Sequence, residues 1–394
     1  MGPVGGGIHY LSDWRACQIP PEQDMREIPA QHTDRYVFLD ILRGLAVLGV
    51  IWHHAYFSSL SSAVVNFEFF GLQIYPLIFN NGWLGVNIFF VLSGFVLFNP
   101  NFLINFEIKK YYKRRVLRLI PLYLFFIVVI GIIDGRSVLF IVWNAILLTT
   151  GVHNIYPPHW HASPFLSVFW SLGVEILFSI GLPAFILAFR RFGFWEIIIT
   201  VIVLSTCYKI FADILSYRLW PNYSNPLINP LKDNIFGRID DFAVGMAASF
   251  VFSKGWRPSQ RQIWSAILVL LVTLYAWNVI FIISERPIYL SVIVSFLHPA
   301  FSVSLSILVI WLLPKIIWQQ KSFIPIVLLG HIVYSAYIVH AFLRKYFNFD
   351  FDNLFSVLLY LVLVYGISII TFLLIEIHGI GKKPRWAARV WSRA

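Results

Sequence analysis

Residues 36–57, YVFLDILRGLAVLGVIWHHAYF, decide the fold class of this chain. The stretch is long enough and apolar enough to cross a bilayer as one helix, which takes about 20 residues. Even so, it contains Asp40, Arg43, His53 and His54. Because titratable groups at membrane depth usually face a protein interior or a water-filled cavity, we predict that this helix lines a functional site.

The spacing of these residues favours Arg43 and His54 as partners. They are eleven residues apart, which places them within about 20° of each other around a helix and about 16 Å apart along it. His53 lies about 80–100° away from their line, so it is the weaker candidate. In the alternative interpretation, Arg43 extends from the helix end to the lipid headgroups and the histidines lie at the opposite interface.

The composition is that of a polytopic membrane protein. Of 394 residues, 59% are hydrophobic and 12% are charged, and the mean hydropathy is +0.75, whereas soluble domains carry about 25% charged residues. The formal net charge of +11 does not predict nucleic-acid binding, because the basic residues lie between apolar spans. Cys17 and Cys207 show neither ligand spacing nor a disulfide framework, so we predict no metal site.

The apolar segments predict an all-α membrane helix bundle of about ten transmembrane helices plus one re-entrant or interfacial segment at 138–150, which is short for a crossing. Residues 1–35 are predicted to be a disordered cytoplasmic tail, residues 36–380 the membrane domain and residues 381–394 a basic cytoplasmic tail. The predicted spans are 36–57, 83–98, 119–133, 167–189, 195–215, 234–253, 262–283, 288–313, 323–343 and 354–378.

The distribution of lysine and arginine predicts the orientation. Residues 58–81 contain neither residue, whereas the next inter-span loop is the most basic stretch of the chain. Its basic residues are Lys109, Lys110, Lys113, Arg114, Arg115 and Arg118. Positively charged loops stay in the cytoplasm, so the first helix is predicted to run outward and both termini to be cytoplasmic.

Six short motifs occur along the chain in a fixed order. They are DILRGLA at 40–46 followed by His54, FFVLSGF at 89–95, RVLRLIPLY at 115–123, WSLGVE at 170–175, RIDDFAVGM at 238–246 and YSAYIVH at 334–340. Together they resemble the acyltransferase-3 family of integral membrane O-acyltransferases, from residue 36 to about 380. One departure weakens a role for Glu376, because Ile377, His378 and Gly379 follow it where the family has Glu-(Arg/Lys)-Pro.

The resemblance implies an activity and its partners. Members of this family move an acyl group, most often acetyl, from cytoplasmic acyl-CoA to a hydroxyl of an extracytoplasmic glycan or glycolipid. O-antigen, exopolysaccharide and lipo-oligosaccharide are the acceptors to expect. The expected partners are therefore acetyl-CoA or another acyl-CoA, the acceptor and membrane lipids, in the cell inner membrane, with no metal and no nucleic acid.

Chemistry suggests roles for four basic side chains. Acyl transfer to a hydroxyl needs a base, together with positive or hydrogen-bonding groups for the oxyanion. His54 is the candidate base because imidazole titrates near neutrality, although a transient acyl-His54 is an open alternative. Arg43 is both a catalytic candidate and a donor-binding one, since its guanidinium can hold a phosphate or carboxylate. Arg115 and Arg118 are predicted to bind the anionic coenzyme A.

Glu175 and Ser93 each have two interpretations. Glu175 lies in an apolar span, so it is a catalytic candidate, or else the partner that keeps Arg43 or Arg238 paired in a medium of low dielectric constant. Ser93 is a candidate substrate-binding residue, or part of a close helix contact made with Gly94.

Three further residues are candidates for substrate binding: Trp170, Arg238 and His340. A tryptophan can stack on a sugar. Arg238 instead forms a structural ion pair if Asp240 or Asp241 is close to it, and His340 can simply lie at the membrane interface.

The main rival to an acyltransferase is a transporter or flippase for a glycan or an anionic metabolite. Such a protein typically has internal repeats with interrupted helices in corresponding halves. The sequence shows no such repeat, and Arg43, His54 and Glu175 all lie in the first half of the chain. A non-catalytic membrane scaffold would not need Arg43 and His54 on one helical face.

Overall fold

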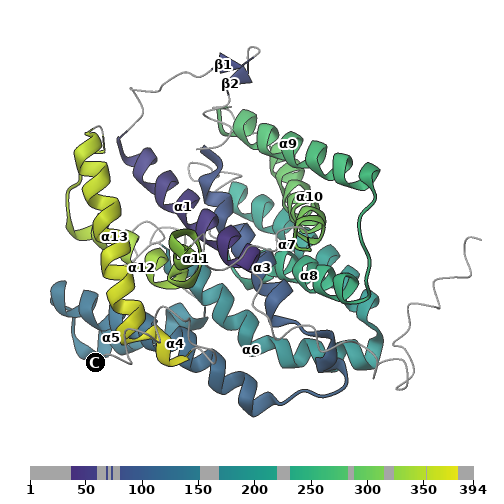
Figure 1. Cartoon of the computed structure of the whole chain (residues 1–394), viewed down its shortest axis with the longest axis horizontal. Helices are drawn as coiled ribbons and strands as arrows, with labels where there is room; N and C mark the ends of the chain where they lie inside the picture. The colour runs from purple at the N-terminus through teal and green to yellow at the C-terminus, as the bar shows by residue number, and fades with distance from the viewer. Residues whose placement is uncertain are drawn as a thin grey trace, which may run out of the picture.

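The chain folds as a bundle of helices (Figure 1). The computed structural model describes residues 37–59, 68–69, 72–73, 80–150, 168–219, 231–282, 288–314, 324–351 and 353–379, so the two predicted tails lie outside the described residues. The helices are α1 (Val37–Ser59), α3 (Gly85–Leu97), α4 (Ile108–Ile133), α5 (Val138–Thr150), α6 (Phe169–Phe192), α7 (Phe194–Leu219), α8 (Ile235–Ser253), α9 (Gln260–Ile282), α10 (Ile288–Leu312), α11 (Ile324–His331), α12 (Val333–Tyr346) and α13 (Leu354–Leu374).

Short elements connect or follow some of the helices. Three 3₁₀ turns are η3 (Asn80–Leu84), η4 (Pro100–Leu103) and η8 (Glu376–Gly379). A two-residue antiparallel hairpin pairs β1 (Glu68–Phe69) with β2 (Leu72–Gln73).

The prediction of an all-α polytopic membrane bundle is confirmed. Within the described residues, seven helices are long and apolar enough to cross a membrane: α1, α4, α6, α7, α9, α10 and α13. Of the other predicted spans, the second is the 13-residue α3, and the one at 234–253 is α8, which buries Arg238, Asp240 and Asp241. The short apolar segment at 138–150 forms α5, which packs against α4 and α6.

Two predicted segments differ from the structure. The basic stretch predicted as a loop is helical, because Lys109 to Arg118 form the first turns of α4; lysine and arginine are good helix formers, so a helix can extend beyond its apolar part. The span predicted at 323–343 is interrupted at Ile332, between α11 and α12. Broken helices are tolerated at membrane depth where protein surrounds them or where they line a cavity.

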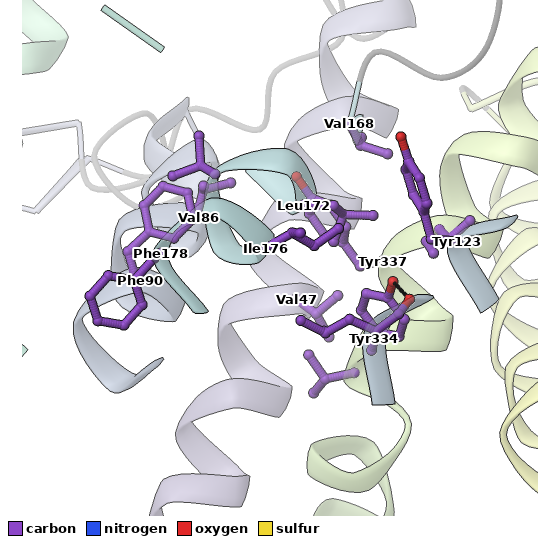
Figure 2. Close-up of a cluster of buried hydrophobic side chains, with 14 of the residues drawn as sticks. Val47, Val86, Phe90, Tyr123, Val168, Leu172, Ile176, Phe178, Tyr334 and Tyr337 are labelled. Carbon is purple, nitrogen blue, oxygen red and sulfur yellow. Dashed lines mark hydrogen bonds between the residues drawn. The ribbon is translucent and has the colours of Figure 1, made fainter. Parts of the chain in front are cut away.

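Helix α1 lies near the middle of the bundle and contacts α3, α11 and α12 (Figure 1). Apolar side chains from these and neighbouring helices form one buried cluster, in which Val47, Phe90, Leu172, Ile176 and Tyr334 come together (Figure 2). The outer helices carry exposed apolar side chains, as α9 does. These outer faces suit contact with lipid.

Glycines allow α3 and α8 to pack closely. A Cβ at Gly94 would overlap the carbonyl oxygen of Phe242, and a Cβ at Gly245 would overlap the carbonyl oxygen of Val91. Small residues let membrane helices approach until their backbones touch. The close contact expected beside Ser93 is therefore present, and it fixes α3 on α8.

A layer of buried ion pairs joins α7 to α8 and the residues before it. Lys209 pairs with Asp240, Lys232 pairs with Asp213 at 3.1 Å, and the guanidinium of Arg238 pairs with Asp233. All six side chains are at most 6% exposed. A buried charge is tolerated only when it is paired and hydrogen-bonded, so these pairs hold each other in place.

The layer continues to α3 and α10 through Asp241. Its carboxylate accepts hydrogen bonds from the Asn87 amide at 3.0 Å and from the Ser302 hydroxyl at 2.5 Å. Asn87 and Arg238 also contact Nδ1 of His298, at 3.2 and 3.1 Å. The carboxylate that Arg238 binds is thus Asp233, rather than Asp240, Asp241 or Glu175.

Replacing Gly94 with alanine is expected to destabilise the protein, because Phe242 cannot yield without a shift of α8. Overpacking of this kind costs about 1–3 kcal/mol. Gly181→Ala in α6 is the matched control, since nothing lies within 4 Å of its Cβ position and alanine is the better helix former by about 1 kcal/mol. Thermal unfolding in one detergent measures both variants. Equal midpoints would contradict the close α3–α8 contact.

Replacing Asp233 with asparagine is expected to lower the free energy of unfolding by about 3–5 kcal/mol, because it leaves Arg238 buried without its carboxylate. Asp134→Asn is the control. Its partner Lys345 is 27% exposed, and partly exposed pairs contribute at most about 1 kcal/mol. Thermal unfolding compares the two variants, and an equal loss in both would show that the Arg238–Asp233 pair is not a main support of the fold.

Candidate functional site

A cavity lies between α1, α3, α4, α6 and the broken helix α11–α12. About 700 Å³ of empty space lies within the cavity and at its open mouth together. The lining residues are Arg43, Val86, Phe89, Phe90, Ser93, Leu97, Arg115, Arg118, Leu119, Ser171, Leu172, Glu175, Gly330, Val333, Tyr334 and Tyr337. Five residues predicted separately from the sequence therefore meet here: Arg43, Ser93, Arg115, Arg118 and Glu175.

Three arginines give the cavity its positive charge. Arg115 and Arg118 lie one turn apart on α4, so their side chains leave the same face of that helix. Arg43 approaches from α1, where its Nη1 lies 3.8 Å from the carboxylate of Asp40. Next to this pair, Gly330 packs directly on the carbonyl oxygen of Asp40, so the interrupted helix holds α1 in position.

Glu175 supplies the carboxylate of the cavity lining. It lies on α6, and the hydroxyl of Ser93 on α3 donates a hydrogen bond to its Oε1 at 3.4 Å. The lining also includes Arg43, Arg115 and Arg118. Of the two partners considered for Glu175, Arg43 shares this cavity, whereas Arg238 binds Asp233.

Hydroxyl groups line the side of the cavity formed by α6 and α12. The hydroxyls of Tyr337 and Ser171 lie 2.6 Å apart. Since Ser171 donates to the carbonyl oxygen of Val168 at 3.0 Å, Tyr337 is the donor to Ser171. The Tyr334 hydroxyl donates to the carbonyl oxygen of Leu119 at 2.5 Å. Both tyrosines are labelled in Figure 2, and both lie in the YSAYIVH motif, which was the only sequence signal for them.

His54 and His340 form a pair beside the cavity rather than in its lining. Nδ1 of His54 lies 3.2 Å from Nε2 of His340, and the rings stack with centroids 5.2 Å apart. Tyr337, which lines the cavity, also contacts the His340 ring at a centroid distance of 5.6 Å. The structure thus pairs two histidines that the sequence placed 286 residues apart.

Trp170 and Arg238 lie together, outside the cavity lining. The guanidinium carbon of Arg238 is 5.8 Å from the centre of the Trp170 ring, within the range of a cation–π contact. Trp170 also packs edge-on against Phe90. Their predicted roles in substrate binding stay predictions.

Metal ligands do not gather in the part of the chain that the structure describes. There, no group of three or more histidine, cysteine, aspartate or glutamate side chains could hold a metal ion. The described lining of the cavity supplies three arginines, one carboxylate and several hydroxyl groups, and two imidazoles lie beside it.

Known proteins share sequence with this chain. Over 83 residues it is 40% identical to a protein of Acidianus two-tailed virus that is named as an acetyltransferase, covering 21% of each chain. Over 185 residues it is 30% identical to the peptidoglycan O-acetyltransferase OatA of Listeria monocytogenes, covering 41% of this chain and 26% of the relative. The chain thus spans about a fifth to a quarter of the length of these curated relatives. No solved structure matches it.

A family defined by an acyltransferase domain matches residues 36–376, which is most of the chain and contains every residue of the cavity and of the histidine pair. The chain belongs to the acyltransferase-3 family.

Proposed function

We propose that this protein is a membrane O-acyltransferase, which moves an acyl group from cytoplasmic acyl-CoA to a hydroxyl of an extracytoplasmic glycan or glycolipid. The observation that carries the proposal is the cavity inside the family's domain whose lining combines Arg43, Arg115 and Arg118 with Glu175. Acetyl is the acyl group we propose, with acetyl-CoA as donor, because both relatives are named as acetyltransferases.

The arginines suit a donor with several negative charges. Guanidinium groups bind phosphates through paired hydrogen bonds, and coenzyme A carries phosphates along its length. Arg115 and Arg118 follow directly on Lys109, Lys110 and Lys113 along α4. Following the positive-inside rule, we propose that this end of α4 and both chain termini face the cytoplasm, where acyl-CoA is found.

The acceptor would approach from the opposite side of the membrane. His54 lies near the end of α1 that this orientation places outside, and Arg43 lies nearer the cytoplasmic end. Tyr337 contacts both the cavity and His340, so it connects the proposed donor site with the proposed base. A glycan acceptor is supported by the peptidoglycan named as the substrate of the Listeria relative.

The reaction can be written with the residues at hand. His54 takes the proton of the acceptor hydroxyl as that oxygen attacks the thioester carbonyl. The new C–O bond forms, the C–S bond breaks, and the coenzyme A thiolate leaves and takes up the proton that His54 had accepted, which returns His54 to its neutral form. Hydroxyl and guanidinium groups of the cavity would stabilise the oxyanion that forms on the way. In the covalent alternative, His54 itself carries the acyl group between the two steps.

Replacing His54 with alanine is expected to lower the transfer rate by about 10²–10⁴-fold, the usual contribution of a general base. The measurement is transfer of labelled acetyl from acetyl-CoA to cell-envelope glycan in membranes that contain equal amounts of inserted protein. His53→Ala is the control and should keep the wild-type rate.

Two results would count against these roles. Full activity in His54→Ala would remove His54 as the base while leaving the family unchanged. Failure of the wild type to acylate any glycan or glycolipid fraction, with acetyl-CoA or with longer acyl-CoA donors, would remove the proposed reaction.

Replacing Arg115 or Arg118 with glutamine is expected to raise KM for acetyl-CoA about 10- to 100-fold, because a hydrogen bond to a charged group contributes about 1.5–3 kcal/mol. The matched control is Arg114→Gln, since Arg114 is exposed on the same helix and does not line the cavity. Initial rates over a range of acetyl-CoA concentrations give the three values. An equal rise in all three variants would indicate a general charge effect instead of a donor site.

A further inference from the structure

We propose that His340 is a positioning residue that sets the tautomer of His54. In this assignment Nδ1 of His54 carries the ring proton and Nε2 carries the lone pair that accepts a proton. The catalytic meaning of this assignment rests on the proposed function, whereas the tautomer itself does not.

The first step concerns the proton on His340. Its Nδ1 lies 3.2 Å from the backbone carbonyl oxygen of Ala336, one turn earlier on α12. A carbonyl oxygen can only accept a hydrogen bond, so Nδ1 of His340 must be the N–H group. The side chain is fully buried, where a neutral imidazole costs much less than a cation. In the neutral ring the other nitrogen, Nε2, is then an acceptor.

The second step transfers this constraint to His54. Nε2 of His340 lies 3.2 Å from Nδ1 of His54. Because Nε2 accepts, Nδ1 of His54 has to donate and must carry the proton. A neutral imidazole has one N–H group, so the lone pair of His54 is on Nε2.

The surroundings hold His340 in this orientation. The hydroxyl of Tyr360 on α13 donates to the backbone carbonyl oxygen of His340 at 3.2 Å, and the ring of Tyr337 packs edge-on against the imidazole. The His340 ring also stacks on His54, with an angle of 25° between the planes. A fixed acceptor beside one ring nitrogen is how serine proteases orient their catalytic histidine, although there the acceptor is an aspartate.

The tautomer can be read directly by solid-state NMR. The full-length protein, labelled with ¹⁵N-histidine and placed in lipid vesicles, gives distinct signals for protonated and unprotonated ring nitrogens. The signals that disappear in His54→Ala belong to His54. We expect a protonated Nδ1 and an unprotonated Nε2 in the wild type and in the control His53→Gln.

Two variants of His340 test its effect on His54. In His340→Leu the ring acceptor is lost, while the backbone of Val50 still offers a hydrogen bond to His54, so part of the His54 population should shift to the other tautomer. We expect kcat to fall by about 10- to 100-fold, the size of the loss when a residue that orients a metal-bound histidine is removed. KM for acetyl-CoA should not change, because Arg43, Arg115 and Arg118 are untouched. In His340→Gln the amide oxygen can accept near the position of Nε2, so the wild-type tautomer and most of kcat should return.

The spectrum and the kinetics separate the two proposals. An unprotonated Nδ1 on His54 in the wild type overturns the assignment, whatever the activity. A His340→Leu variant that keeps the wild-type tautomer, or a His340→Gln variant that keeps it yet is as slow as His340→Leu, overturns the positioning role of His340. If the wild type transfers no acyl group but shows the expected tautomer, the proposed function fails and the assignment stands.

Discussion

The cost of charge inside a bilayer governs this structure. In the layer between α7, α8 and α10, each buried lysine and arginine has a carboxylate partner within the protein. The cavity is different, because its described lining has three arginines and only one carboxylate, that of Glu175. Adding Asp40, which lies beside Arg43, still leaves an excess of positive charge. Such an excess suits the anionic coenzyme A thioester that we propose as the donor.

The interrupted helix α11–α12 brings these charges together. A continuous helix would satisfy its own backbone, whereas the break at Ile332 is tolerated because the segment is enclosed by protein and borders the cavity. On one side of the break, Gly330 docks on the backbone of α1 beside Arg43. On the other side, α12 carries Tyr334, Tyr337 and His340. A single irregularity therefore places the cation of α1 and the hydroxyls of α12 around one space.

Much of the cavity could be predicted from single residues in unusual places. Arg43 and Glu175 stand out because charge is rare in apolar spans, and Arg115 and Arg118 because their stretch is so basic. Tyr337 and Ser171 did not stand out, since hydroxyl-bearing residues are ordinary in membrane helices and their importance comes from a contact between α6 and α12. For the same reason the pairing of His54 with His340 was not predictable. The break at Ile332 was missed because hydropathy measures how apolar a segment is and does not report whether its backbone is continuous.

In the proposed mechanism, the histidine pair shows how the same constraint acts on the base, His54. In a soluble enzyme a buried carboxylate often orients a catalytic imidazole, but at membrane depth that carboxylate would need a compensating charge of its own. His340 does the same work as a neutral acceptor, because its own proton is bound to the carbonyl oxygen of Ala336. The charged groups that suit the donor can then stay in the cavity, while the base is oriented without adding a net charge beside it. Tyr337 lines the cavity and also contacts the ring of His340, so the proposed donor site and the histidine pair lie next to each other.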